Sequence, residues 1–238
     1  MIAKAIDKIL ELYRPALVKA ENGHEYSTVS IKRVDSTLRA TPITVSTLSS
    51  VVDYIALCGD NLKDIPYYIH VVSPTRVELI SALDEDRERE TIIVAEAETP
   101  LIPFGRYLDN ETMLITLQSV FVDDPDTDRA ALLKFAGTVK SNTVRDYNDD
   151  GVTQQATIKH GVSSMAQAIV PSPCKLRPYR TFREIEQPAS QFIFRMKDTG
   201  SGVESALIEA DGGAWRIEAK ETIRKYIADR IENCTVMA

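Results

Sequence analysis

Three β-rich runs that follow one another at short spacing place the strongest constraint on the fold. They lie between Tyr67 and Glu98 and read "YYIHVV", "RVELISAL" and "TIIVAEAE". The tight turn Ser73-Pro74-Thr75 joins the first two runs, and the charged run "DEDRERE" joins the second to the third. Short connections of this kind are typical of antiparallel hairpins. The sequence therefore predicts an antiparallel meander in which the charged run is a solvated loop.

Two further hairpins are indicated nearer the C-terminus. "QFIFRMKD" and "VESALIEAD" flank the turn Thr199-Gly200-Ser201-Gly202. The segment 143–160 resembles a hairpin that turns at Asn148-Asp149-Asp150-Gly151. One face of its second strand is entirely polar, so this hairpin is expected to stand partly in solvent. A separate strand is expected over 26–34, where apolar and polar residues alternate.

Several segments show the helical spacing of apolar residues, at 2–13, 48–55, 109–121, 127–137 and 214–232. Ser46 or Thr47 is expected to cap the second helix and Gly59 to end it. The third segment is ambiguous because its Thr and Ile content also suits a strand. We favour a helix there, with Asp109 or Asn110 as its N-cap.

These elements predict one α+β domain over residues 1–238, with a mostly antiparallel sheet and hairpins, bracketed by the N- and C-terminal amphipathic helices. The hairpin at 143–160 can protrude from it. The chain is 44% hydrophobic and 26% charged, which is typical of a soluble globular protein. No segment reaches membrane-spanning length and no signal peptide is evident, so a membrane partner is not expected. The three cysteines are widely separated, which fits a reducing cytoplasm.

The charge of the chain is negative and unevenly distributed. The formal net charge is −7, which argues against indiscriminate binding to nucleic acid. From Asp84 to Glu98 there are seven acidic and two basic residues, whereas from Pro171 to Gly200 there are six basic and three acidic residues. Such polarity can serve a ligand or a neighbouring copy of the same chain.

The basic segment "KLRPYRTFR" is the most distinctive candidate for an interaction surface. As an extended strand it would place Lys175, Arg177, Tyr179, Thr181 and Arg183 on one face and Arg180 on the other. A basic face with a central aromatic side chain is typical of a surface that binds single strands. The competing interpretation is a sheet strand whose basic stems cover apolar surface and pair with Glu184, Glu186 or the acidic loop of a neighbouring copy. Because the chain is acidic and has one such stripe, we favour self-association through Lys175, Arg177, Tyr179, Arg180 and Arg183.

Familiar catalytic motifs are missing from the sequence. The histidines are His24, His70 and His160, and His70 lies in an apolar run where a packed side chain is expected. There is no GxSxG, HExxH, Walker or GxGxxG motif. "ADGGAW" could offer backbone N–H groups to a phosphate, but Asp211 opposes an anion there and suits an aspartate-capped turn. A pair of carboxylates remains open, because the chain has 35 acidic residues.

Two acidic clusters resemble calcium loops in part. "DYNDDG" has oxygen ligands at Asp146, Asn148 and Asp150 before Gly151, but Thr157 stands where a bidentate Glu is needed. A plain hairpin turn is the favoured interpretation. In "DDPDTD" the match is weaker, and Asp124 or Asp126 is expected to cap the following helix. We expect neither a metal nor a cofactor.

The strings "LRPYRTFREIEQPASQFIFRMKD", "ALIEADGGAW" and "DDGVTQ" together resemble the YfdQ-like proteins of phages and prophages, a family of unknown function. The resemblance runs from about Thr47 to the C-terminal helix and is most specific in the last third. It implies a viral or prophage origin and a bacterial cytoplasm. The family brings no established catalytic residues, so none is transferred to this chain.

We therefore expect a non-enzymatic phage-type protein that acts as a homo-oligomer, with a ring or shell as one form of assembly. The alternative is a nucleic-acid-associated accessory protein that uses the basic-aromatic strand 175–183. An enzyme acting on a small phosphorylated metabolite ranks below both.

Overall fold

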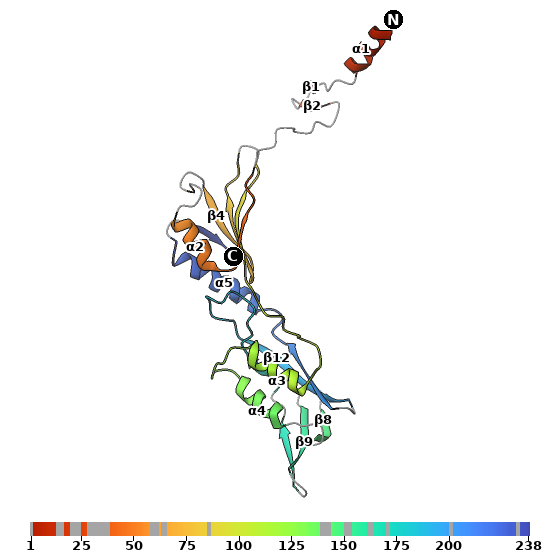
Figure 1. Ribbon diagram of the computed structural model, residues 1–238, viewed down its shortest axis with the longest axis vertical. Helices are drawn as coiled ribbons and strands as arrows, with labels where there is room; N and C mark the ends of the chain where they lie inside the picture. Colours follow the sequence, from red (N-terminus) through yellow and green to blue (C-terminus); the bar gives the residue numbers. More distant parts are fainter. Residues whose placement is uncertain are drawn as a thin grey trace. The chain divides into compact units, whose positions relative to one another are not determined.

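The computed structural model divides the chain into two compact units, Met1–Arg39 and Ala40–Ala238, where the sequence analysis expects one domain over residues 1–238 (Figure 1). Its described residues are 2–12, 17–19, 25–27, 39–57, 62, 66–84, 87–138, 144–149, 154–160, 164–169, 172–199, 202–231 and 234–238.

The described residues of the first unit form a helix and a small hairpin. Helix α1 (Ile2–Leu12) confirms the predicted amphipathic N-terminal helix. Strands β1 (Leu17–Lys19) and β2 (Glu25–Ser27) pair antiparallel, with Leu17 opposite Ser27. The predicted strand over 26–34 is seen only at its start, because residues 28–34 lie outside the described part of the chain.

A five-stranded sheet forms the first layer of the second unit. Its strands, in spatial order, are β14 (Thr235–Met237), β4 (Tyr67–Ser73), β5 (Arg76–Ser81), β6 (Thr91–Glu96) and β3 (Ile43–Val45). β4, β5 and β6 pair antiparallel and confirm the predicted meander. The two edge strands were not predicted, and each pairs parallel with its neighbour.

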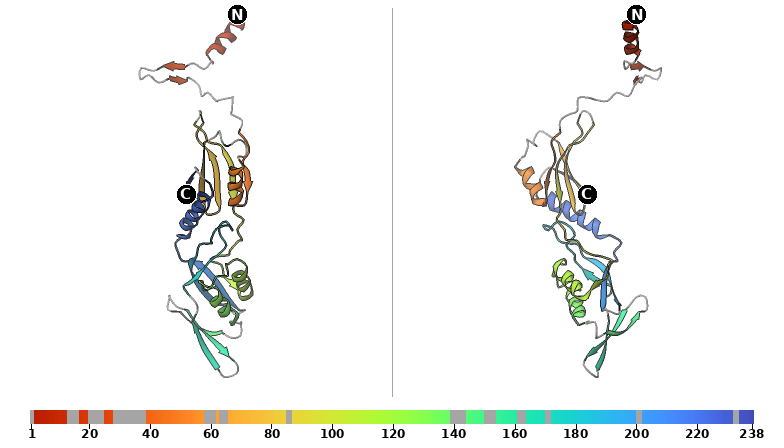
Figure 2. Two further views of the ribbon diagram at one scale, coloured as in Figure 1. Left: turned by 90° about the vertical axis from the view of Figure 1, so that its left-hand side faces the viewer. Right: turned by 45° about the vertical axis from the view of Figure 1, so that its right-hand side comes forward.

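Helices α2 (Leu48–Ala56) and α5 (Trp215–Ala228) cover one face of this sheet, where they pack on the buried side chains of the meander (Figure 2). Every second residue of the strands is buried there, as in Ile69 and Val71. Thr47 caps α2 by accepting a hydrogen bond from Ser50 N, as predicted. The helix ends at Ala56 with Leu57 as its C-cap, and the predicted stop at Gly59 lies outside the described residues.

A four-stranded sheet carries the second core of this unit. Its order is β11 (Cys174–Leu176), β12 (Ser190–Asp198), β13 (Val203–Glu209) and β7 (Leu108–Asp109), and the β12–β13 pair confirms the predicted hairpin. Helices α3 (Asn110–Ser119) and α4 (Arg129–Thr138) contribute Met113, Leu117, Leu132 and Phe135 to the core. The ambiguous segment is therefore helical, and Asp109 is its N-cap.

The cap predicted for α4 is wrong. The Asp124 carboxylate accepts from Asp126 N and pairs with Arg177, so it holds the preceding turn. Asp128 directly precedes the helix, and its carbonyl accepts the first hydrogen bond, from Leu132 N. The Asp128 carboxylate accepts from Lys175 N at 2.7 Å, which ties the start of α4 to β11.

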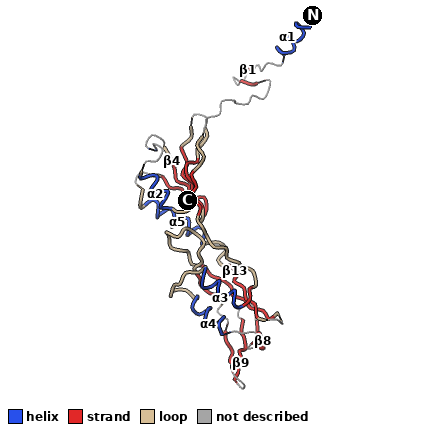
Figure 3. Tube along the Cα trace, viewed as in Figure 1, coloured by secondary structure: helices blue, strands red, loops and turns tan. Residues whose placement is uncertain are grey.

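The predicted hairpin at 143–160 is confirmed as β8 (Val144–Asp149) and β9 (Gln154–His160) (Figure 3). An additional strand, β10 (Ser164–Ile169), pairs with β9 and was not predicted. Asp146 and Asn148 of the calcium-like sequence lie within β8, whereas residues 150–153 lie outside the described chain.

The class is α+β, with helices beside mostly antiparallel sheets, as the sequence predicted. None of the helices in the described residues has the length and apolar character needed to cross a lipid bilayer.

Candidate interaction surfaces

The basic segment at 175–183 is not the extended strand that the sequence suggested. Only Cys174–Leu176 is a strand, and Pro178 makes a single bridge with Phe121. The chain then runs irregularly to Ala189. Leu176 belongs to the core of the four-stranded sheet, whereas Phe182 belongs to the core of the five-stranded sheet. The segment therefore leaves the strand path in order to place side chains in two cores, and the predicted basic face does not form.

Arg177 is neutralised inside the chain. Its guanidinium Nη1 lies 3.0 Å from the Asp124 carboxylate and 2.6 Å from the Glu186 carboxylate. The predicted pairing with Glu186 is thus present within one copy. Because two carboxylates already surround it, Arg177 has little charge to offer a polyanion or a second chain.

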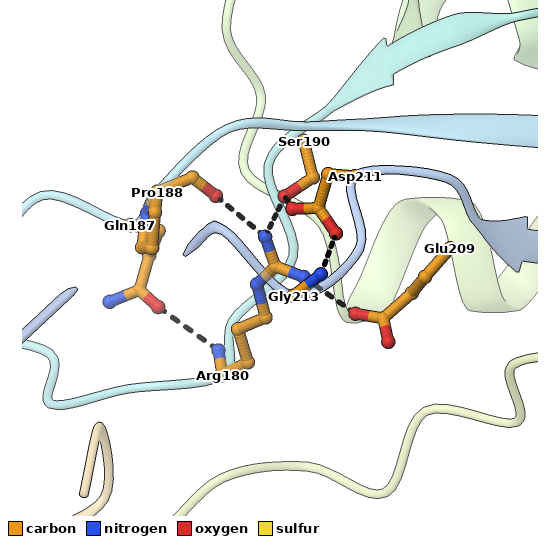
Figure 4. Close-up of polar contacts among 7 residues, drawn as sticks. All are labelled: Arg180, Gln187, Pro188, Ser190, Glu209, Asp211 and Gly213. Atoms are coloured by element: carbon orange, nitrogen blue, oxygen red, sulfur yellow. Dashed lines mark hydrogen bonds and ion pairs between the residues drawn. The ribbon is translucent and has the colours of Figure 1, made fainter. Parts of the chain in front are cut away.

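Arg180 is the most deeply buried of the five predicted interaction residues, with 7% of its surface exposed. Nη1 donates to Glu209 Oε1 at 2.8 Å, and Nη2 donates to the Pro188 carbonyl and the Ser190 hydroxyl (Figure 4). The guanidinium also lies over the Trp215 ring. This arrangement links segment 177–189, the β12–β13 hairpin and the first turn of α5.

The network places one cation beside two carboxylates, those of Glu209 and Asp211. Burial lowers the pKa of the Arg180 guanidinium to about 10, while Glu209 and Asp211 oppose the shift, so the side chain stays charged at neutral pH. Burial raises the pKa of Asp211, but hydrogen bonds from the Ser190 hydroxyl and Gly213 N outweigh it and hold the pKa below its usual value. A cation held in this way is an internal group whose loss would leave its carboxylate partner unpaired, and it is not a surface group.

The turn before α5 explains "ADGGAW" without a phosphate. Gly212 and Gly213 have φ values of +63° and +84°, which side chains rarely tolerate. Asp211 Oδ1 accepts from Gly213 N at 3.0 Å, so a carboxylate already occupies that donor (Figure 4). The helix N-cap is Ala214, which makes no side-chain cap, and the aspartate therefore caps the turn.

Lys175 and Arg183 are the exposed members of the predicted set. The guanidinium carbon of Arg183 lies 3.7 Å from the ring centroid of Tyr179, so one face of this aromatic ring is covered within the chain. Tyr179 N donates to the Val120 carbonyl, which fixes the backbone beneath the ring. The five residues are therefore two exposed cations, one ring covered on one face and two arginines that are paired within the chain.

Two further residues hold the irregular segment in place: Glu184, which was expected to pair with a basic side chain, and Gln187, which was not predicted. Glu184 Oε1 accepts from Leu48 N at 2.7 Å and from Ser49 N at 3.2 Å, so its charge lies at the N-terminus of α2. Gln187 Oε1 accepts from Arg180 N at 3.0 Å, and its Nε2 donates to the Phe182 carbonyl. Both partners of Glu184 are far away in sequence, so no local pattern could reveal this contact.

A polar groove lies beside the β3 edge of the sheet. One part has a volume of about 610 Å³ and is lined by Thr44, Ser50 and Glu96 among others. An adjoining pocket of about 270 Å³ shares Ser46, Ala97 and Glu98 with it and extends to Arg183. A third pocket of about 210 Å³ contains both Lys175 and Asp211, so its charges are mixed. The lining of the first two hollows includes hydroxyl and charged groups, and the third also has the apolar side chains of Ala189, Ala214 and Trp215 in its lining.

Where the structure describes them, the residues considered for catalysis or metal binding are not brought together. His70 is half-buried in β4, opposite Glu78 of β5. Burial, with a contribution from Asp128, raises the pKa of the Cys174 thiol to about 12. Within the described residues, His, Cys, Asp and Glu side chains form no group of three or more that could hold a metal ion.

Apolar surface is exposed at places that the sequence analysis did not weigh. In α1 the side chains of Ile6, Ile9 and Leu10 are 51–59% exposed. In the second unit, Ile43 of β3 and Met237 of β14 are 45% and 41% exposed. These side chains lie on a helix and on the two edge strands of one sheet.

Comparison of the chain with protein-family models, with curated proteins and with solved structures found no match.

Proposed function

We propose that this chain is a self-associating protein of phage or prophage type that acts through a homo-oligomeric ring or shell and not by catalysis. The observation that carries the proposal is the apolar stripe of α1. The resemblance of residues 176–198 to YfdQ-like proteins supports the viral origin, and with it a bacterial cytoplasm.

Within the described residues of the first unit, nothing gives the α1 stripe the burial that a short helix needs. Ile6, Ile9 and Leu10 are each more than half exposed, although their spacing puts them on one side of the helix. A helix of 11 residues is marginal in water without tertiary packing. Burying this stripe against an apolar partner would therefore stabilise both the helix and the complex.

A second copy is the partner that fits the charges of α1. The helix carries Lys4 and Lys8 against Asp7 and Glu11, so its net charge is zero. An anionic membrane preferentially binds helices that have an excess of Lys and Arg on the polar face. A polyanion such as a nucleic acid also preferentially binds basic helices. A neutral helix with an apolar stripe is suited to pack against the same helix of a second copy.

The distribution of basic side chains also supports self-association over nucleic-acid binding. Arg177 and Arg180 are paired with carboxylates of the same chain, which leaves Lys175 and Arg183 exposed in that segment. Two cations release few counterions, so a strong and salt-sensitive hold on a nucleic acid is not supported.

The proposal is tested by light scattering coupled to size exclusion on the whole chain. We expect a particle well above the 26.5 kDa of one copy at micromolar concentration. The double variant Ile6→Ser/Ile9→Ser should reduce its mass, whereas the matched variant Lys4→Ser/Lys8→Ser on the polar face should not. A monomeric wild-type chain would refute the proposal. Flotation of the chain with phosphatidylserine vesicles, lost in the Ile variant, would assign α1 to a membrane surface instead.

A further inference from the structure

We infer that the five-stranded sheet continues from one copy to the next, with the β3 edge of one chain pairing with the β14 edge of its neighbour. This inference rests on the proposed self-association and names a contact for it in the second unit. The occupant of each edge is a second copy of this chain.

Within the described residues both edges of the sheet are unpaired, and their one protection against pairing is that each strand is only three residues long. Within the described residues, no strand pairs with the outer side of β3 or of β14. Exposed edges are commonly blunted by charged side chains that discourage pairing. β3 reads Ile43-Thr44-Val45 and β14 reads Thr235-Val236-Met237, so neither strand contains a charge. Their β-branched residues favour the extended conformation that strand addition needs.

The directions of the strands make the two edges complementary. β4 and β6 both pair antiparallel with β5, so they run the same way. β14 is parallel to β4 and β3 is parallel to β6, so both edge strands share that direction. If the sheet simply continues into a neighbouring copy, the β14 strand of that copy therefore runs parallel to β3. Each edge strand already pairs in parallel with its neighbour inside the chain.

The side chains of the two edges also match. Val45 and Val236 face the core on the side covered by the helices. Thr44 points to the opposite face of β3, and so do Thr235 and Met237 on β14. Continuation of the sheet would then align the helix-covered faces of neighbouring copies and extend one core along the assembly.

The charges beside the edges favour this pairing over pairing of like edges. Residues 88–98, beside β3, contain four acidic residues and one basic residue. Residues 215–231, which comprise α5 and the three residues after it, contain five basic and three acidic residues, and α5 packs on β14. Joining unlike edges brings these opposite charges together, whereas joining two β3 edges would place acidic segments side by side.

Pairing of unlike edges is a head-to-tail contact. Such contacts close into a ring when the rotation between copies allows it and otherwise give an open filament. A contact between two β3 edges would be symmetric and would stop at a dimer. The two possibilities can be separated by cross-linking.

The experiment uses chains in which Cys58 and Cys234 are replaced by Ser and single cysteines are placed at the edges. One chain carries Thr44→Cys on β3. The other carries Thr235→Cys or Met237→Cys on β14, because either position can lie opposite Thr44, depending on the register of the two strands. Neighbouring strands bring Cα atoms within disulfide distance, so oxidation with copper phenanthroline should join paired edges. We expect a cross-linked dimer from the mixture and little from either chain alone. A chain with cysteines at both edges should give a ladder of higher species.

The matched control replaces Thr44→Cys by Leu101→Cys, a fully exposed position outside both edges, and should give only background linking in the mixture. Dimers from Thr44→Cys alone would show like-edge pairing and overturn the inference. An oligomer by light scattering without any cross-link would also overturn it while leaving the proposed function intact. A monomer would refute both.

Discussion

The guanidinium carbon of Arg180 lies 3.9 Å from the ring centroid of Trp215. This contact joins an irregular segment after β11 to the first residue of α5. The same guanidinium donates to Glu209, so the cation is held between a ring face and a carboxylate. Arg180, one of the five residues predicted to form an interaction surface, therefore acts as a structural tie.

Removing this tie should destabilise the second unit. Arg180→Ala leaves Glu209 without its cation and opens a void against Trp215, and breaking a buried ion pair costs about 3–5 kcal/mol. We expect the lower end of that range, because Glu209 is partly exposed and water can solvate it. Urea unfolding followed by tryptophan fluorescence measures the loss, since the chain has one Trp.

Lys175→Ala is the matched control, because it removes an exposed cation from the same segment and should change stability by no more than about 0.5 kcal/mol. The free energy of unfolding of Arg180→Lys should lie between those of Arg180→Ala and Lys175→Ala, since Lys keeps the charge but loses the planar stacking on Trp215. Equal stability of Arg180→Ala and wild type would contradict the structural role.

The stability contributed by Asp211 should depend on pH in a defined direction. Its folded pKa lies below the value of about 3.9 that is usual for Asp, so its contribution is complete above that pH and is lost as the pH falls through the folded pKa. Asp211→Asn should cost about 1 kcal/mol at pH 7 through weaker hydrogen bonds. Denaturation from pH 7 to 2.5 should show the two unfolding free energies converging below about pH 4. A constant difference would mean that the carboxylate charge is unimportant.

The N-cap of α3 offers a local test. Asp109 accepts from Thr112 N and from the Thr112 hydroxyl, and these hydrogen bonds lower the pKa of the carboxylate. Asp109→Ala should destabilise the unit by about 1 kcal/mol in thermal or urea unfolding. Asp109→Asn keeps a good N-cap, so it should lose only a small part of the stability that Asp109→Ala loses. A larger loss in the Asn variant would contradict the capping role.

The Cys174 thiol should be inert in the folded protein. It is fully buried and its pKa is raised to about 12, so almost none of it is thiolate at pH 8. Mass spectrometry after a short iodoacetamide pulse at pH 8 should find Cys174 unmodified. The same pulse in denaturing urea should modify it, which serves as the control. Fast labelling in the native state would show that the β11 region opens readily.

The exposed cations of the basic segment should matter little for nucleic acid. Lys175→Ala/Arg183→Ala should leave the oligomer unchanged, and a short single-stranded oligonucleotide should already bind negligibly to the wild type at about 150 mM salt. Submicromolar binding that the double variant abolishes would favour the nucleic-acid interpretation. Fluorescence anisotropy over a salt series measures this.

Elements whose contacts are local could be predicted from the sequence. The meander from Tyr67 to Glu96 was recognisable because short turns join strands with alternating residues. The cap Thr47 and the cap Asp109 were recognisable because each bonds within three residues of itself. In these places sequence neighbours are also spatial neighbours, so a local pattern is sufficient.

Elements that depend on distant partners could not be predicted. β3 and β14 are three residues long and show no periodicity, and each exists because a remote strand pairs with it. The irregular path after Leu176 depends on Glu209 and Trp215, which lie about thirty positions further along and bury Arg180. The alternation of residue types predicted a strand over this segment. The path that the chain takes is instead determined by packing against residues that are distant in sequence.

The interleaved order of the two sheets has a consequence for synthesis. The meander ends at Glu96, but its apolar face is completed by Ile223 and Ile227 of α5 and by β14 at its edge. At translation rates of about 5–20 residues per second, the emerging sheet waits on the order of ten seconds for these residues. During that interval a ribosome-bound chain exposes the surface that α5 later covers, so chaperones have most access to this protein before residues 215–237 are made.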